Sequence, residues 1–189
     1  MPYHLRKQAV EHFCKGFQEY PFSIDSLYFS PKTLGCANLW SLDSEDKQST
    51  MVCYAFDDYE NWIKPYPIEI YLSQYEKLLG EWQKGCDVLR QRTGGRLVEM
   101  QTFAIAAYAH FKSDYLQTKF SYLKKEKEQN AEKLQEIIAE EKQNAVALLN
   151  ALYQNAFVGF EASNHYYYTD RNIIEKILLL SSWEPPTRI

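Results

Sequence analysis

The segment 97–153 contains neither glycine nor proline and consists almost entirely of good helix formers. Its first half is apolar on most faces, which is typical of a central, buried helix. A single helix of this length would exceed what compact domains normally contain. We expect a turn in the charged stretch 124–130, where no apolar period is visible, although one unbroken helix is the alternative. The segment predicts a mainly α-helical fold.

Three more helices follow from the spacing of apolar residues. In 3–19, apolar side chains recur every three or four positions, and Pro21 ends the pattern. Pro67 is suited to the first turn of a helix that runs to Gly94-Gly95. Thr169 is a good N-cap for a last helix. Together these segments predict about five helices.

Two glycines lie inside the helix expected after Pro67. Gly80 and Gly85 each cost about 1 kcal/mol relative to alanine in a helix interior. We therefore expect a neighbouring element to approach this helix closely.

Residues 21–66 lose the helical period and contain Pro31, Gly35 and Pro65. Within them, 37–42 and 50–56 flank a polar stretch, which predicts a small β-hairpin. A lone hairpin is marginal in water, so this one would lie on the helices. We predict a single domain over 1–189, an antiparallel helical bundle of about five helices with an irregular aromatic insertion at about 21–66.

Charge and hydropathy exclude several classes of protein. The formal net charge is -4 and the pI is about 5.6, which disfavours nucleic acid as a partner. No run approaches about 18 apolar residues, and the first residues lack the apolar core of a signal peptide. We therefore expect no membrane association and a cytoplasmic location.

The cysteines and histidines suggest no cofactor. Cys14, Cys36, Cys53 and Cys86 form no C-x-x-C pair, which favours reduced, mostly buried thiols. A nucleophilic role for Cys36 or Cys53 is disfavoured because no histidine partner can be assigned. The sequence contains neither Glu-x-x-His nor H-E-x-x-H and no phosphate-binding glycine loop, so we predict no metal and no cofactor.

Aromatic residues make up 15% of the chain, and one loop concentrates them beside polar groups. Residues 159–168 include Glu161, Asn164, His165 and Tyr166. Aromatic faces stack on the apolar faces of sugars, while such polar side chains can hydrogen-bond hydroxyl groups. The loop therefore suits a carbohydrate. The alternative is that its tyrosines pack between helices and its polar residues hold a turn.

Neighbouring carboxylates precede a tryptophan at Asp57, Asp58 and Trp62. They resemble the acid and base of a glycosidase, but adjacent side chains rarely point at one bond, and N-capping of a short helix is the favoured interpretation. Trp40 follows a turn and could face the same cleft as Asn38.

Two adjacent carboxylates, Glu140 and Glu141, lie in the second half of the glycine-free segment. We interpret this pair as part of a solvated helix face.

Several of these segments together resemble the helical C-terminal region of large bacterial glycoside-hydrolase-like proteins. The matching segments are 35–39, 50–52, 57–62, 66–67, 74–78 and 159–168, followed by Glu175-Lys176. The resemblance implies that a catalytic domain lies outside this chain, because a barrel of the usual kind takes about 250 residues. It also implies that the chain packs against that domain or forms one wall of its substrate cleft.

We accordingly predict an accessory, non-catalytic helical domain of a carbohydrate-processing protein. No catalytic residue is assigned, and the partners expected are a carbohydrate and the catalytic domain. The residues expected to contact the sugar are Glu161, Asn164, His165 and Tyr166, with Trp62 and Trp40 in secondary roles.

Two alternatives are open. One is a helical protein-interaction or oligomerisation module whose aromatic surface is buried against a partner or a second copy. The other is a small stand-alone hydrolase that uses Glu161 with Asp57 or Asp58.

Overall fold

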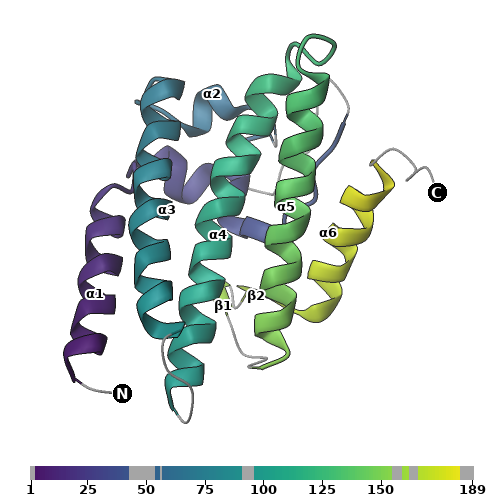
Figure 1. Ribbon diagram of the computed structural model, residues 1–189. Helices are drawn as coiled ribbons and strands as arrows, with labels where there is room; N and C mark the ends of the chain where they lie inside the picture. Colours follow the sequence, from purple (N-terminus) through teal and green to yellow (C-terminus); the bar gives the residue numbers. More distant parts are fainter. Residues whose placement is uncertain are drawn as a thin grey trace.

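The computed structural model describes residues 3–42, 54–55, 57–90, 96–154, 159–161 and 166–183. Five long helices lie side by side in chain order, each antiparallel to its neighbour (Figure 1). They are α1 (Tyr3–Gln18), α3 (Ile68–Arg90), α4 (Arg96–Lys124), α5 (Ala131–Leu152) and α6 (Asp170–Ser182). The prediction of a mainly helical fold is confirmed. None of the helices in these ranges is long and apolar enough to cross a membrane.

The glycine-free segment is broken where its apolar period fails. Turns occupy 125–130 between α4 and α5, as the sequence predicts. The Asn130 side chain stabilises them by donating hydrogen bonds to the carbonyl oxygens of Leu123 and Glu126, at 3.2 and 3.1 Å. Helices α4 and α5 are thereby folded against each other.

Thr169 starts α6 as predicted. Its hydroxyl accepts a hydrogen bond from the Asn172 amide at 3.2 Å, and the Thr169 amide donates to the Asn172 side chain at 3.0 Å. This reciprocal pair satisfies two backbone donors that a helix start otherwise leaves without an intrahelical partner.

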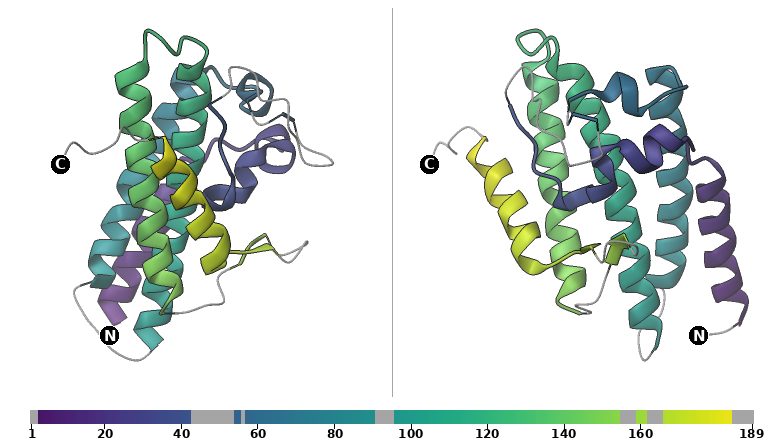
Figure 2. Two further views of the ribbon diagram at one scale, coloured as in Figure 1. Left: turned by 90° about the vertical axis from the view of Figure 1, so that its right-hand side faces the viewer. Right: turned by 180° about the vertical axis from the view of Figure 1, so that it is seen from behind.

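The insertion contains three short helical segments rather than the predicted hairpin. They are η1 (Asp25–Phe29), η2 (Pro31–Ala37) and α2 (Tyr59–Trp62), and they cross one face of the row of helices (Figure 2). Residues 38–42, part of the first predicted strand, form no strand, and most of the second, 50–56, lies outside the described residues. The hairpin prediction is not supported.

Lysine side chains explain why residues 38–42 do not need a partner strand. The carbonyl oxygen of Asn38 accepts a hydrogen bond from Lys176, and that of Ser41 accepts one from Lys124 at 2.8 Å. Backbone groups that a strand would pair with another strand are satisfied by side chains of α6 and α4 instead.

The two strands that the structure does contain lie elsewhere. β1 (Gly159–Glu161) and β2 (Tyr166–Tyr167) pair antiparallel just before α6. They lie on the same face of the helices as the insertion (Figure 2). The insertion and the two strands thus share one face of the row of helices.

The glycines of α3 differ in their surroundings. A Cβ atom on Gly85 would lie 2.3 Å from the ring of Phe13 on α1, whereas a Cβ atom on Gly80 would meet nothing within 4 Å. The close approach predicted from the two glycines is therefore confirmed at Gly85 alone.

We expect Gly80→Ala to raise the free energy of unfolding by up to about 1 kcal/mol, because alanine favours the helix and finds open space. Gly85→Ala gains the same propensity but must displace Phe13, so it should be about 1–3 kcal/mol less stable than Gly80→Ala. Urea denaturation of both variants measures the difference. Equal stabilities of the two variants would show that Phe13 and α1 move aside without a cost in free energy.

Candidate functional site

The two tryptophans predicted to contact sugar lie in the core. Trp62 is 0% exposed and packs among the tyrosines of α2 and α3, and Trp40 is 6% exposed with its ring stacked on Phe120 at a centroid distance of 4.8 Å. Neither ring has a free face on which a sugar could stack. Their indole rings stabilise the packing of the insertion on the helices.

The other predicted sugar contacts lie outside what the structure describes. Asn164 and His165 are not among the described residues, and the side chains of Glu161 and Tyr166 are not described either. The carbohydrate site in this loop stays a prediction. The same holds for the hydrolase alternative, which needs the position of the Glu161 carboxylate.

The Asp57-Asp58 pair is divided between two structural roles. Asp58 is the residue before α2 and accepts a hydrogen bond from the Asn61 side chain at 2.7 Å, without a side-chain bond to the helix backbone. Asp57 lies 2.5 Å from the ammonium group of Lys124, which is almost fully buried. Asp57 thus anchors the end of the insertion to α4.

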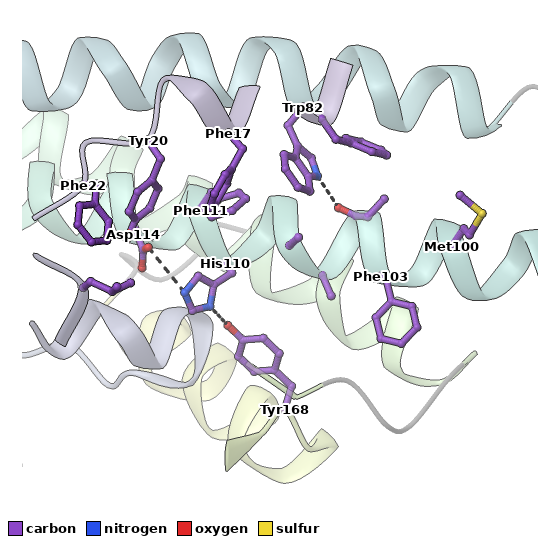
Figure 3. Close-up of a pocket in the computed structure, with 15 residues that line it drawn as sticks. Phe17, Tyr20, Phe22, Trp82, Met100, Phe103, His110, Phe111, Asp114 and Tyr168 are labelled. Atoms are coloured by element: carbon purple, nitrogen blue, oxygen red, sulfur yellow. Dashed lines mark hydrogen bonds and ion pairs between the residues drawn. The ribbon is translucent and has the colours of Figure 1, made fainter. Parts of the chain in front are cut away.

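A large apolar pocket lies on the face that carries the insertion. Its volume is about 910 Å³, and it is bounded by α1, the residues that follow α1, α3, α4 and Tyr168 (Figure 3). Most of its wall is aromatic or aliphatic, including Phe22, Trp82 and Phe103. This volume and composition are typical of sites for small organic ligands.

Contacts between rings hold the aromatic wall of the pocket. Trp82 packs against Phe13 and Phe111 with centroid distances of 4.7 and 5.1 Å, and its indole N–H donates to the Ala104 carbonyl at 3.0 Å. Tyr20 lies 6.1 Å from the Phe111 ring. These contacts fix the wall before any ligand binds.

One side of the pocket is polar. His110 and Asp114 are four residues apart on α4, and the His110 Nε2 atom lies 3.7 Å from the Asp114 carboxylate. The other ring nitrogen, Nδ1, lies 2.7 Å from the Tyr168 hydroxyl (Figure 3). Tyr75 donates to the same carboxylate at 3.3 Å. We name Asp114, His110 and Tyr168 the polar wall.

Burial determines the protonation of the tyrosine in the polar wall. Tyr168 is 1% exposed, and desolvation raises its pKa well above the usual value, so the phenol stays protonated. A neutral phenol can donate to His110 or accept from it. The contact positions the phenol to orient the imidazole.

A glycine makes room for the contact between His110 and Tyr168. Gly35 has a φ of +49°, and a Cβ atom there would lie 2.3 Å from the Tyr168 hydroxyl and 2.5 Å from His110 Nδ1. Neither the conformation nor the space suits another residue. The insertion therefore helps to shape the polar wall through a residue without a side chain.

A buried ionic cluster lies behind the polar wall. Glu141 on α5 and Lys176 on α6 are both 0% exposed, with 3.6 Å between the ammonium nitrogen and the carboxylate. Ser113 donates to Glu141 at 2.5 Å, and Lys176 also bonds to the Asn38 carbonyl and lies 4.1 Å from the centre of the Trp40 ring. The cluster connects α4, α5, α6 and the insertion.

The interpretation of Glu140 and Glu141 as a solvated face is wrong for Glu141. Glu140 is exposed and pairs with Lys112 at 3.0 Å, but Glu141 points into the core. The sequence contained a signal that Glu141 is buried, since it lies three residues after Ile138 and four before Ala145, both of which are buried. Adjacent residues on a helix point about 100° apart, so the pair cannot share one environment.

Cys36 lies between the polar wall and the buried ionic cluster, and its thiol is not activated. Its thiol donates to the Ala109 carbonyl at 3.4 Å and lies 3.3 Å from the Asn144 amide nitrogen. Full burial raises the pKa of Cys36 well above the usual value, with Glu141 adding to the effect. The thiol therefore stays protonated, which makes it a poor nucleophile.

The pocket residues that sequence reasoning missed are His110 and Asp114. Their spacing of four residues on a predicted helix, directly after the apolar run that begins at Phe103, was the available signal. What could not be seen is Tyr168, which reaches them from another part of the chain. Among the described residues, no group of three or more histidine, cysteine or acidic side chains could hold a metal ion.

Comparisons with protein-family models, with curated proteins and with solved structures found no match for this chain. The resemblance to glycoside-hydrolase-like proteins stays a prediction.

Proposed function

We propose that this chain binds a small, mostly apolar organic molecule in the pocket between α1, α3 and α4, without transforming it. The observation that carries the proposal is the preformed cavity of about 910 Å³ with an aromatic wall and one polar wall. Apolar ligands gain affinity by burying surface in such a site, and a few polar groups orient them.

We expect the polar wall to bind and orient a ligand. The phenol of Tyr168 is buried and protonated, and Cys36, whose thiol is also buried and protonated, does not line the pocket. The His110 imidazole lies beside the phenol as its hydrogen-bonding partner. Hydrogen bonding to one end of a ligand needs only the donors and acceptors already in place.

We expect N-phenyl-1-naphthylamine, an uncharged apolar dye, to bind with saturable fluorescence and one site per chain. Ala107 lines the pocket, so Ala107→Phe should fill part of it and weaken dye binding by at least about tenfold. Ala131→Phe is the matched control, because Ala131 is exposed at the start of α5 and away from the pocket. Fluorescence titration measures the binding, and thermal unfolding checks that both variants are folded.

Unsaturable dye binding, or equal binding by the two variants, would count against the pocket. The interaction-module alternative would then gain support, because Phe22, Ile24, Leu27 and Tyr28 expose large apolar side chains close together in sequence. Light scattering across a range of concentrations would detect self-association.

The carbohydrate-binding accessory domain is a separate proposal. It is supported by the residue types of the 159–168 loop and by the resemblance. A polyol needs many hydrogen-bonding partners, which the aromatic wall of the pocket does not offer.

A further inference from the structure

The charges that face the pocket restrict the class of ligand. Among the described residues that line it there is one carboxylate, Asp114, and one imidazole, His110, but no lysine and no arginine. With Asp114 ionised and His110 neutral, the wall carries one negative charge. With His110 protonated, the two groups cancel. In neither state does the pocket offer a net positive charge to an anion.

Asp114 is held at the pocket as an acceptor. Its side chain is 3% exposed, and His110 Nε2 and the Tyr75 hydroxyl lie 3.7 and 3.3 Å from the same carboxylate oxygen. The longer distance is that of an ion pair rather than of a hydrogen bond. A buried carboxylate in an apolar surrounding interacts strongly with a cation that reaches it, because little water screens the attraction.

Aromatic rings provide the rest of a site for a cation. Phe17, Tyr20 and Phe111 line the pocket, with ring centroids 5.6 to 6.3 Å apart. Tyr20 also packs against Tyr75, which contacts Asp114. In Figure 3 the labelled rings of Phe17, Tyr20 and Phe111 lie together on one side of the pocket, near Asp114. Ring faces attract organic cations and at the same time bury their apolar carbons.

We propose that the ligand is an apolar organic cation, such as an alkyl or aryl amine, whose ammonium group pairs with Asp114 while its carbon body fills the aromatic part of the pocket. This inference rests on the proposed function, since it names the class of ligand for the same site. It disfavours fatty acids and other apolar carboxylates, because the described residues that line the pocket offer them no net positive charge.

The test compares three probes that share one carbon chain and differ in charge. Octylammonium, octan-1-ol and octanoate compete with N-phenyl-1-naphthylamine for the wild-type protein at pH 7. We expect octylammonium to bind about tenfold or more tightly than octan-1-ol, because its charge meets a buried carboxylate. Octanoate should bind most weakly of the three.

A substitution locates the effect. Asp114→Asn keeps the shape of the side chain and removes its charge, so the preference for octylammonium over octan-1-ol should fall to about twofold or less while octan-1-ol still binds. Asp87→Asn is the matched control, because Asp87 is an exposed carboxylate of α3 outside the pocket. If Asp114→Asn fails to fold, the comparison of the three probes with the wild-type protein still decides.

The outcomes separate the two proposals. If octylammonium binds no more tightly than octan-1-ol, or does not displace the dye at all, the cation proposal is overturned while dye binding preserves the apolar-ligand proposal. The same holds if Asp114→Asn keeps the full preference. If the dye itself does not bind, both proposals fail together.

Discussion

Lys176→Met is expected to lower the free energy of unfolding by about 3–5 kcal/mol, because it leaves the Glu141 carboxyl group fully buried without its cation. The bond from Lys176 to the Asn38 carbonyl and its contact with the Trp40 ring are lost as well. Urea denaturation measures the effect. Lys133→Met is the control, since Lys133 is an exposed residue of α5 and should change stability by no more than about 0.5 kcal/mol.

The double variant Glu141→Leu with Lys176→Met should recover most of the loss, because replacing both buried charges by apolar side chains removes two desolvation penalties together. A double variant as unstable as Lys176→Met alone would mean that the pair stabilises the fold by more than its desolvation costs. Ser113 loses its acceptor in the double variant, so the recovery is expected to be incomplete.

The loss of stability caused by Lys176→Met should grow as the pH rises. Burial lowers the pKa of Lys176 to about 8 from 10.5, with the Glu141 carboxylate opposing the shift. Between these values the unfolded wild-type chain binds more protons than the folded one, so this lysine makes the wild type more stable as pH rises. In Lys176→Met, the buried Glu141 has its pKa raised further, so that variant loses stability with rising pH. A gap in stability that narrows from pH 6 to pH 10 would contradict this account.

Gly35→Ala should lower the free energy of unfolding by about 2–4 kcal/mol. The backbone at Gly35 has a φ of +49° and a ψ of -132°, which alanine rarely adopts, and the added Cβ atom would collide with the Tyr168 hydroxyl and the His110 ring. The contact between His110 and Tyr168 must then open, so dye binding in the pocket should weaken too. Gly80→Ala makes the same chemical change in open space and is the control for both measurements.

A Gly35→Ala protein that keeps wild-type stability would show that η2 can shift without cost. If the variant is destabilised but binds the dye as tightly as the wild type does, the polar wall does not contribute to dye binding.

Local residue patterns predicted the helices well. The start of α6 followed from Thr169, and the break before α5 followed from the loss of apolar period at 124–130. Signals of this kind involve residues within a few positions of one another. They predict helices well because the hydrogen bonds of a helix also join residues that are close in the sequence.

The insertion and the pocket could not be predicted in the same way. The segment 37–42 was predicted to be a strand because it and 50–56 flank a polar stretch, but two lysines from distant helices satisfy carbonyl groups within it instead. The pocket needs α1, α3, α4 and Tyr168 to be placed together, and no local pattern contains that information. Glu141 is an intermediate case, because helical spacing placed it among buried residues while its charge argued for solvent.

The arrangement of the helices has a consequence for the order of folding. The long helix α4 packs against α3 and α5, to which only the short segments 91–95 and 125–130 connect it, so these contacts close short loops at a small cost in entropy. The bond from Lys176 to Asn38, by contrast, joins residues that are 138 positions apart. We therefore expect the helical hairpins to form early and the insertion to be fastened to α6 late, so that substitutions at Lys176 accelerate unfolding far more than they slow folding.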